Sequence, residues 1–546
     1  MTVHPLGDSA AVIVLGEMIA PGVAARARAI ATEILRREFA WVVDIVPAFA
    51  SVAVHFDPVR APEFSAVRAE LVAWVAGAES LAAAVESRTV EVPVVYGGDA
   101  GPDLSDVARH TGLAPAEVIA RHAAADYEVH AIGFSPGFPY LGGLPAELAM
   151  PRRVTPRARV PAGSVGIGGA QTGVYPLASP GGWNLIGRTP LALFDPHRAE
   201  PALLRAGDRV KFRAVTAGDF FNAAGGGSPA PEKRNARSPT AVEIVRPGMF
   251  STVQDLGRPG HRALGVPLGG AADSFALRLA NLLVGNAEDA AALEFTLVGP
   301  VLRFLRDALV AIAGAEVVGV ASWLPFVVRA GSVLDLSRLG AGCRGYFAIA
   351  GGIDVAPVLG SRGTFVRGGF GGFSGRLLQA GDRLPVPEVS RDPGDHWRID
   401  PRVVPELARP ATLRVVAGTH AEEFDAAWTM HEFKVTAQSD RMGVRLSGAA
   451  LRRATAGELL SAPVTPGTVQ VPPDGQPIVL LADAQTIGGY PRLAHVIAVD
   501  LPRAAQLRPG DAVRFTPVSL DEARRLAHAQ ERALVLLRAG LAQKLR

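Results

Sequence analysis

A serine in the segment GFSPG, residues 133–137, has the spacing of a nucleophile elbow, Gly-x-Ser-x-Gly. In such an elbow, the residue after the serine donates its backbone N–H to the oxyanion that forms during the reaction. Here that residue is Pro136, which has no N–H, and the residues that follow are too rich in Pro and Gly to form a helix. We therefore predict a rigid loop that presents aromatic side chains, and not a catalytic serine.

Arginine supplies the next candidate group. Arg188 ends the segment PGGWNLIGR, a Gly-rich turn followed by an apolar stretch, and Asn184 lies four residues before it. A guanidinium can bind a carboxylate or a phosphate through two hydrogen bonds, and a side-chain amide can donate beside it. We therefore predict that Arg188 binds an anion. The four arginines within residues 152–159 are either part of such a site or a solvated, charged edge.

Two polar clusters follow later in the chain. Gln254, Asp255 and Arg258 lie on a loop bounded by Gly and Pro, while Asp483 and Gln485 come after an apolar strand and before the bend TIGGYP. Polar groups at strand ends are common in binding sites. Each aspartate has a structural alternative, because a carboxylate in such a loop can also cap or brace a turn.

Several kinds of chemistry have no matching motif. The four lysines (211, 233, 434 and 544) form neither a phosphate loop nor a biotin-attachment motif, and no H-E-x-x-H sequence occurs. The single cysteine, Cys343, excludes an internal disulfide and a multi-cysteine zinc site, and we predict no metal site. The formal net charge of +3 is small, and no basic stripe alternates with aromatic residues, so we expect no nucleic-acid partner.

Turn-rich β structure is expected to position these groups, because the chain of 546 residues holds 60 Gly and 43 Pro. The form L-x-x-G-D-x-[VL] occurs at 204–210, 378–384 and 507–513, each time before an alternating strand. VPAGSVGI (160–167) and VTPGTVQV (464–471) precede the first and third copies at nearly the same distance. We therefore predict three related β domains.

The ends and the middle of the chain differ from these repeats. The first 88 residues read as strands alternating with amphipathic helices, which predicts a small split β-α-β (ferredoxin-like) domain. Residues 222–240 are almost wholly Gly, Ala, Ser, Pro and charged residues, which is typical of a linker, and 519–543 reads as a terminal helix with Ser519 as its cap. The predicted boundaries are an N-terminal α+β domain at 1–88, a β-barrel domain at 89–220, a linker at 221–240, and further β domains at 241–395 and 396–546.

No membrane span or export signal is expected. The most apolar window, 309–328, contains Glu316, two glycines and Pro325, and it reads as two strands of a hairpin. The N-terminus lacks the basic head and cleavage site of a secretory signal. We therefore expect a cytoplasmic protein.

Five motifs in the chain together resemble two known families; in chain order they are GFSPGFPYLGGLP, PGGWNLIGRTP, TVQDLGRPGH, SDRMGVRL and ADAQTIGGYP. The families are the bacterial Kip inhibitor of a sporulation kinase and the Kip antagonist, described as the B-type and C-type subunits of the ATP-dependent 5-oxoprolinase. The same pair is similar to the carboxyltransferase region of urea carboxylase and has been named allophanate hydrolase subunits 1 and 2. Residues 1–220 match the B-type family and 241–540 match the C-type family, so the linker would be a fusion joint.

The resemblance implies a mainly β fold with α+β parts, in which the repeated domains are cyclophilin-like β-barrels. It also implies a site between the barrel of the B-type part and the C-type part. Carried over by motif, the residues of the first wall are His130, Phe134, Pro136, Asn184 and Arg188. Those of the other walls are Gln254, Asp255, Arg258, Asp483, Gln485 and Tyr490.

The activity implied is that of a 5-oxoprolinase component, which hydrolyses 5-oxo-L-proline to L-glutamate with cleavage of ATP. A lactam is stabilised by resonance, so its opening needs activation, for which phosphoryl transfer from ATP would serve. We assign Arg188 and Arg258 to anion binding, and Asp255 or Asp483 to acid–base catalysis. Because the chain has no phosphate loop, we expect an A-type partner subunit to contribute to the binding of ATP and Mg²⁺.

Two other functions stay open. A biotin-dependent carboxyltransferase would move CO₂ from biotin to urea or a similar amide, and a non-enzymatic module would inhibit a histidine kinase. Shared fold does not decide among these reactions. The sequence also leaves open whether the protein forms a homo-oligomer.

Overall fold

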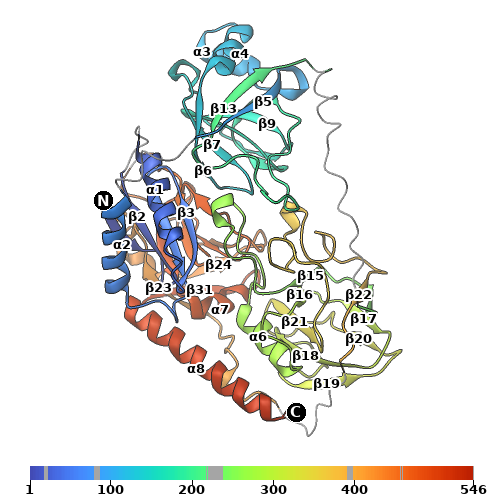
Figure 1. The fold of residues 1–546 in the computed structure, drawn as a ribbon. Helices are drawn as coiled ribbons and strands as arrows, with labels where there is room; N and C mark the ends of the chain where they lie inside the picture. The colour runs from blue at the N-terminus through green and yellow to red at the C-terminus, as the bar shows by residue number, and fades with distance from the viewer. Residues whose placement is uncertain are drawn as a thin grey trace.

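Four units surround a common junction in the computed structural model, which describes residues 1–16, 22–78, 87–216, 218, 238–389, 398–455, 457 and 459–544. In chain order they are the N-terminal domain (residues 1–78), the first barrel (89–214), the middle unit (238–389) and the second barrel (411–517), as Figure 1 shows. The C-terminal helix α8 (Leu520–Lys544) runs from the second barrel to the middle unit. Its cap is the predicted Ser519, whose hydroxyl accepts a hydrogen bond from the Glu522 N–H at 3.1 Å.

The N-terminal domain is an antiparallel sheet, ordered β1-β2-β4-β3, with two helices packed on it. Its elements are β1 (Thr2–Pro5), β2 (Ala10–Val14), α1 (Val23–Arg36), β3 (Val42–Pro47), β4 (Ser51–Phe56) and α2 (Phe64–Ala78). Because β4 lies antiparallel between β2 and β3, the unit β2-α1-β3 is the split β-α-β that the sequence predicts. The edge strand β1 was not predicted, and residues 79–86 lie outside the described part.

The two barrels are closed, and each contains seven strands. The first has the order β10-β7-β6-β13-β5-β12-β9, with β5 (Thr89–Tyr96), β6 (Tyr127–Ile132), β7 (Pro139–Gly142), β9 (Ser164–Gly168), β10 (Gln171–Val174), β12 (Asn184–Arg188) and β13 (Arg209–Ala214). Helices α3 (Leu104–Thr111) and α4 (Pro115–Ala124) cover one side of it.

The second barrel has the same circular order, read as β28-β25-β24-β31-β23-β30-β27. Its strands are β23 (Ala411–Ala417), β24 (Phe433–Val435), β25 (Gly443–Ser447), β27 (Thr468–Gln470), β28 (Ile478–Leu480), β30 (Arg492–Val496) and β31 (Ala512–Pro517), and the short helix α7 (Leu501–Ala505) precedes β31. Each barrel also carries a two-stranded ribbon: β8 (Arg157–Val160) with β11 (Ser179–Gly181), and β26 (Ala462–Pro463) with β29 (Ile487–Gly488). The predicted repeat therefore corresponds to two copies of one topology.

The middle unit differs from the closed barrel expected for the second repeat copy, because it is built of two open sheets around a buried apolar core. The first sheet contains β20 (Val333–Asp335), β17 (Val301–Phe304), β14 (Thr240–Arg246) and β22 (Arg383–Pro385). The second contains β15 (Phe250–Gln254), β16 (Ala292–Thr296), β21 (Arg344–Ile349), β18 (Ala308–Gly314) and β19 (Pro325–Val328), and α6 (Ser274–Leu283) packs on it. The strand after the Gly-Asp turn, β22, runs antiparallel to β14, whereas β13 and β31 run parallel to the first strands of their barrels.

Three further predictions can be compared with the described residues. The apolar window forms the antiparallel hairpin β18–β19, as predicted. No helix in the described ranges is both long enough and apolar enough to span a membrane. The predicted linker at 221–240 lies outside the described residues except for 238–240.

Candidate functional site

The loop between β15 and α6, residues 255–272, is called the junction loop here because it contacts all four units. It holds the predicted residues Asp255 and Arg258. Its hydrogen bonds to other units include those from Gly260 N–H to the Asp44 carboxylate (2.9 Å), from Gly137 N–H to the Leu264 carbonyl (2.8 Å) and from Gly269 N–H to the Ala482 carbonyl (3.0 Å). Residues far apart in the sequence therefore meet at this loop.

The GFSPG loop joins β6 to β7 and packs between the junction loop and the ribbon β26/β29. Gly133 lies so close to Ile487 of β29 that an added Cβ would be 2.7 Å from the isoleucine side chain. Phe134 has a φ of 60°, which is unusual for a residue with a side chain. The Ser135 hydroxyl is buried without a hydrogen-bond partner, Pro136 is buried, and a strand rather than a helix follows. The loop is thus part of the contact between the two halves of the chain and does not have the geometry of an elbow.

The two glycine-rich motifs meet in one apolar cluster. Trp183 of the GGW motif and Ile487 of the TIGGY bend are both buried in it, together with Phe138 and Tyr140. His130 borders this cluster, with its ring 5.9 Å from that of Phe49, and burial lowers its pKa. Motifs from the first and the second half of the chain therefore share an interface.

Arg441 lies at the centre of a buried charge network that links the second barrel to the middle unit. Its Nε and Nη2 donate to the Asp483 carboxylate at 2.8 and 3.0 Å, and its Nη1 donates to the Glu294 carboxylate. Its Nη2 also donates to the Gly270 carbonyl of the junction loop at 2.6 Å. Burial acts to lower the pKa of Arg441, but the two carboxylates outweigh it and raise the pKa above its ordinary value. Every nitrogen of this guanidinium is paired.

The network continues toward α6. Glu294 also accepts hydrogen bonds from the Ala272 N–H at 2.9 Å and from the Tyr346 hydroxyl at 2.8 Å. Asp273 caps α6 by accepting from the Ala276 N–H at 2.8 Å, and it accepts from Gln506 of the second barrel at 2.8 Å. Burial raises the pKa of Asp273 to about 6.

Arg258 is fully buried, and its surroundings differ from those of Arg441. Its Nη2 donates to the Gly363 carbonyl, and its guanidinium lies 5.1 Å from the centre of the Phe370 ring. Its Nε and Nη1 are buried without hydrogen-bond partners. Burial lowers the pKa of Arg258, while the nearby Asp255 and Asp483 carboxylates act in the opposite direction. A buried guanidinium with two unpaired nitrogens is costly, which is typical of a group that completes its hydrogen bonds with a ligand.

Glycines leave room around this side chain. An added Cβ at Gly269 or Gly371 would lie 3.0 Å from a terminal nitrogen of Arg258. An added Cβ at Gly363 would lie 2.9 Å from the Oε1 atom of Gln254, which is itself buried without a partner. Glycine backbone thus borders the unpaired Nη1 of Arg258 and the unpaired Oε1 of Gln254.

Asp255 is held by three donors. Its carboxylate accepts from the Gly257 N–H at 2.8 Å, from the Ser361 hydroxyl at 2.7 Å and from the Arg362 N–H at 2.5 Å. These bonds fix the start of the junction loop against the segment at 361–363. These contacts agree with the structural alternative for Asp255, in which the carboxylate braces a turn. Asp483 also has a structural contact, because it pairs with Arg441 through two hydrogen bonds.

The remaining predicted residues lie around the edges of this region. Asn184 is buried and donates to the Pro151 carbonyl at 2.9 Å, while Gln485 donates to Gln470 at 3.3 Å. Tyr490 is 45% exposed. Arg188 donates through Nε to the Ala162 carbonyl at 2.8 Å, and within the described ranges it makes no hydrogen bond or ion pair with the second half of the chain.

The arginine cluster at 152–159 is partly structural. Arg153 and Arg157 both pair with the buried Asp103, at 3.1 and 2.7 Å, and Asp103 also accepts from the Leu185 N–H at 2.7 Å. These contacts anchor the ribbon β8/β11 to the first barrel. They favour a structural role for these two arginines over a solvated edge.

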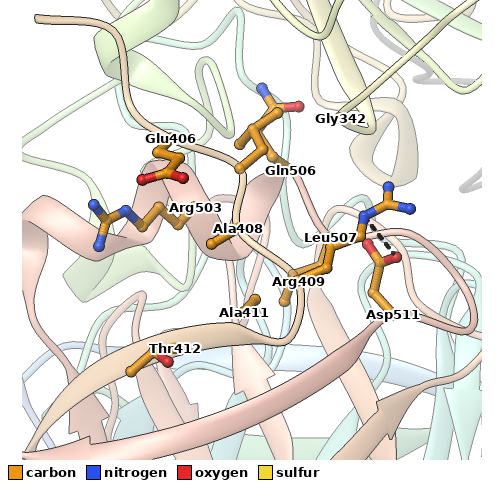
Figure 2. Close-up of a pocket in the computed structure, with 11 residues that line it drawn as sticks. Gly342, Glu406, Ala408, Arg409, Ala411, Thr412, Arg503, Gln506, Leu507 and Asp511 are labelled. Atoms are coloured by element: carbon orange, nitrogen blue, oxygen red, sulfur yellow. Dashed lines mark ion pairs between the residues drawn. The ribbon is translucent and has the colours of Figure 1, made fainter. Parts of the chain in front are cut away.

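A separate hollow of about 210 Å³ lies between the middle unit and the second barrel, and Figure 2 shows it. Arg409 and Asp511 form an ion pair at its rim, 3.4 Å apart, and Glu406 and Arg503 lie at the opposite side. Its lining includes Gln506, which belongs to the Arg441 network, but none of the residues predicted from the sequence. Across the ranges that the structure describes, no group of three or more His, Cys, Asp or Glu side chains could hold a metal ion.

Sequence reasoning missed the residues that complete the network, namely Arg441, Glu294, Asp273 and Gln506. Arg441 lies within the quoted motif SDRMGVRL, and a charged residue directly before an apolar strand is a weak signal that could have drawn attention to it. Glu294 occupies a buried position of β16, where only the structure reveals the partner 147 residues away.

Comparisons with known proteins cover both halves of the chain. The family described as the carboxyltransferase domain, subdomain C and D, matches residues 1–204, and the family described as the carboxyltransferase domain, subdomain A and B, matches residues 264–517. The C-type subunit of 5-oxoprolinase from Escherichia coli (strain K12) is 44% identical over 303 residues, which are 53% of this chain and 96% of that protein. The B-type subunit of 5-oxoprolinase from Bacillus subtilis (strain 168) is 44% identical over 228 residues, which are 40% of this chain and 94% of that protein.

Two further similarities extend these findings. The crystal structure of TTHA0988 superposes with a TM-score of 0.80 at 37% identity, and the match covers 93% of this chain and 99% of that one. The urea amidolyase of Lachancea kluyveri is 35% identical over 344 residues, which are 56% of this chain but only 18% of that enzyme. The first similarity shows that a chain of nearly this length adopts the same arrangement of units.

Proposed function

The chain belongs to the families of the B-type and C-type subunits of 5-oxoprolinase, joined in one polypeptide, and from this premise we propose that it is a component of an ATP-dependent 5-oxoprolinase. With an A-type subunit it would hydrolyse 5-oxo-L-proline to L-glutamate while ATP is cleaved. The observation that carries the proposal is that relatives of both kinds are covered almost from end to end, one by each half of the chain.

The junction is the proposed site of this activity. It is built by the GFSPG loop of one half and by the junction loop and the TIGGY bend of the other, so it would form only when both parts are together. Arg258 would bind the substrate carboxylate or the charge that develops on the lactam oxygen, because its Nε and Nη1 lack partners. Gln254, whose Oε1 is also unpaired, would accept a hydrogen bond from the lactam N–H.

Roles for the other residues follow from their contacts. Asp255 and Asp483 are fully engaged by donors, and this supports a positioning role in place of the acid–base role expected for them. Phe134 and Pro136 would close the apolar wall of the site. Since the chain has no phosphate loop, the A-type subunit would contribute to the handling of ATP and Mg²⁺.

The direct test is to combine the purified chain with its A-type partner and to measure L-glutamate and ADP released from 5-oxo-L-proline and ATP. We expect both products in equal amounts, and none from either protein alone. The variant Arg258→Met should slow product release at least about thirtyfold while the two proteins still assemble. Failure of the complete mixture to release glutamate would reject the proposal.

A second function is favoured by one observation, the similarity of the C-type half to urea amidolyase and to the carboxyltransferase families. A carboxyltransferase would use biotin carried by a partner protein. The chain would be incubated with labelled bicarbonate, ATP, urea and a biotinylated carboxylase, and the label in urea would be measured. Transfer of the label to urea without lactam hydrolysis would support the second function.

A further inference from the structure

A second buried guanidinium without a carboxylate partner lies at the start of β30. Arg492 is 8% exposed, and its Nη1 donates a hydrogen bond of 3.3 Å to the Pro463 carbonyl of the ribbon β26/β29. Within the described residues it forms no ion pair. Arg414 on the neighbouring strand β23 differs from Arg492 because it has a carboxylate partner: its Nε and Nη2 donate to Asp500 at 2.9 and 2.6 Å.

Two glutamine side chains, Gln470 and Gln485, lie next to each other at the strand pair that carries Arg492. Gln470 pairs with Arg492 across β27 and β30, and its Oε1 accepts a 3.3 Å hydrogen bond from Gln485. Its Nε2 is buried without a partner. Gly488 faces both amides, because an added Cβ there would lie 2.7 Å from Nε2 of Gln470 and 3.3 Å from Nε2 of Gln485. The absence of a side chain at Gly488 therefore lets the backbone approach two amide donors closely.

Two histidines border Arg492 in the described part of the chain. His420 accepts from the Arg492 N–H through Nδ1 at 3.1 Å, and His495 is buried with its Nε2 unpaired. Burial lowers the pKa of His420 to about 4 and that of His495 to about 3, and the charge of Arg492 acts in the same direction on both. Burial likewise lowers the pKa of Arg492 to about 10, with no carboxylate to oppose it.

Within the described ranges, three acidic groups of this region are held by other partners. Asp500 is held by Arg414, Glu423 pairs with Arg453, and Asp8 of the N-terminal domain accepts from the Ala498 N–H at 3.0 Å. A buried cation that lacks a countercharge in the protein is a ready partner for an anion from solution, because pairing offsets the cost of its desolvation.

We propose that Arg492, together with the Gln470 and Gln485 amides beside Gly488, binds a small oxyanion, either a carboxylate or a phosphate group. This site is distinct from the one at Arg258, which lies among Asp255, Asp483 and Arg441, and the proposal does not depend on the reaction proposed above. The guanidinium supplies the countercharge, and the Nε2 groups of the two glutamines supply neutral donors at one side of the anion.

The test is an anion titration of the full-length chain by isothermal titration calorimetry at constant ionic strength, once with inorganic phosphate and once with acetate. We expect one of the two anions to bind, and which one binds identifies the group that the site takes. The variant Arg492→Gln should weaken binding at least about tenfold, as expected for the loss of a charge-assisted hydrogen bond.

Two variants complete the design. Gly488→Ala keeps every charge but places a methyl group against the Gln470 amide, so it should displace that donor and also weaken binding, and it decides the question if Arg492→Gln does not fold. Arg514→Gln is the control, because it removes an exposed arginine of the same barrel, paired with Glu432, and should leave the affinity unchanged. Binding that survives both Arg492→Gln and Gly488→Ala, or the absence of binding of either anion to the unmodified chain, would overturn the proposal.

Discussion

Arg441 and Arg258 are buried within the same junction, and they differ in what surrounds the guanidinium. Arg441 is paired with two carboxylates and a carbonyl, whereas two nitrogens of Arg258 have no partner. The contrast shows that Arg441 links the units, and it supports our proposal that Arg258 binds a ligand. Burial alone therefore does not reveal the role of an arginine, and the count of its paired nitrogens is more informative.

The largest loss of stability is expected when Arg441, the arginine with carboxylate partners, is replaced. Arg441→Met leaves the Asp483 and Glu294 carboxylates buried without a countercharge, which should lower the free energy of unfolding by about 3–5 kcal/mol. Urea unfolding of the full-length chain measures this loss. Arg441→Lys keeps the charge but not the bidentate geometry, so its free energy of unfolding should lie between those of the unmodified chain and of Arg441→Met. A loss below about 1 kcal/mol for the methionine variant would contradict the structural role of Arg441.

Removal of the unpaired member should affect binding and leave stability nearly intact. Arg258→Met removes a buried charge that no carboxylate holds, so the free energy of unfolding should change by less than about 1 kcal/mol. The same change should raise the free energy of the catalytic transition state by about 2–5 kcal/mol, measured as kcat/KM of the assembled enzyme. A variant that is strongly destabilised yet fully active would reverse the assignment.

A pH measurement sharpens the description of the Arg441 network. The pKa of Asp273 is raised to about 6 in the folded chain, so this carboxyl adds stability at low pH, and the contribution is lost as the pH rises through about 6. Between pH 7.5 and pH 5 the unmodified chain should therefore gain about 1.4 kcal/mol relative to Asp273→Asn. Urea unfolding of both proteins at the two pH values tests this, since effects of the substitution that do not depend on pH cancel. An identical pH response of the two proteins would contradict the raised pKa.

The smallest effect is expected at Arg188. This half-buried side chain donates to the Ala162 carbonyl, and within the described ranges it makes no hydrogen bond or ion pair with the junction loop, so Arg188→Ala should cost less than about 1 kcal/mol of stability. Its effect on kcat/KM should be smaller than that of Arg258→Met. A loss of activity equal to that of the Arg258 variant would place Arg188 in the site, as the sequence suggested.

The repeat could be predicted from the sequence because its signal is local. Asp208, Asp382 and Asp511 each accept a hydrogen bond from the backbone N–H three residues earlier, at 2.8, 2.7 and 2.8 Å. The Gly-Asp turn is thus held by the same side-chain-to-backbone hydrogen bond in all three copies. Whether the following strand closes a barrel depends on distant strands, and for this reason the open sheets of the middle unit were not foreseen.

The site was predictable only in part, for the same reason. Motifs indicated that the GFSPG loop and the TIGGY bend belong together, and Gly133 and Ile487 are indeed in contact. The pairing of Arg441 with Glu294 connects residues 147 positions apart and has no local signature. Only the packed structure shows that the nitrogens of Arg441 are all hydrogen-bonded and that two nitrogens of Arg258 are not.

The contact between the GFSPG loop and the TIGGY bend has a consequence for folding during synthesis. The first half of the chain is complete on the ribosome before its partner surfaces exist, and the contact of Gly133 with Ile487 must await synthesis of some of the last residues. At typical translation rates of about 5–20 residues per second, this delay is on the order of 20–70 s. During that interval the nascent first half exposes its glycine-rich and aromatic face, so chaperone capture during translation should be concentrated there.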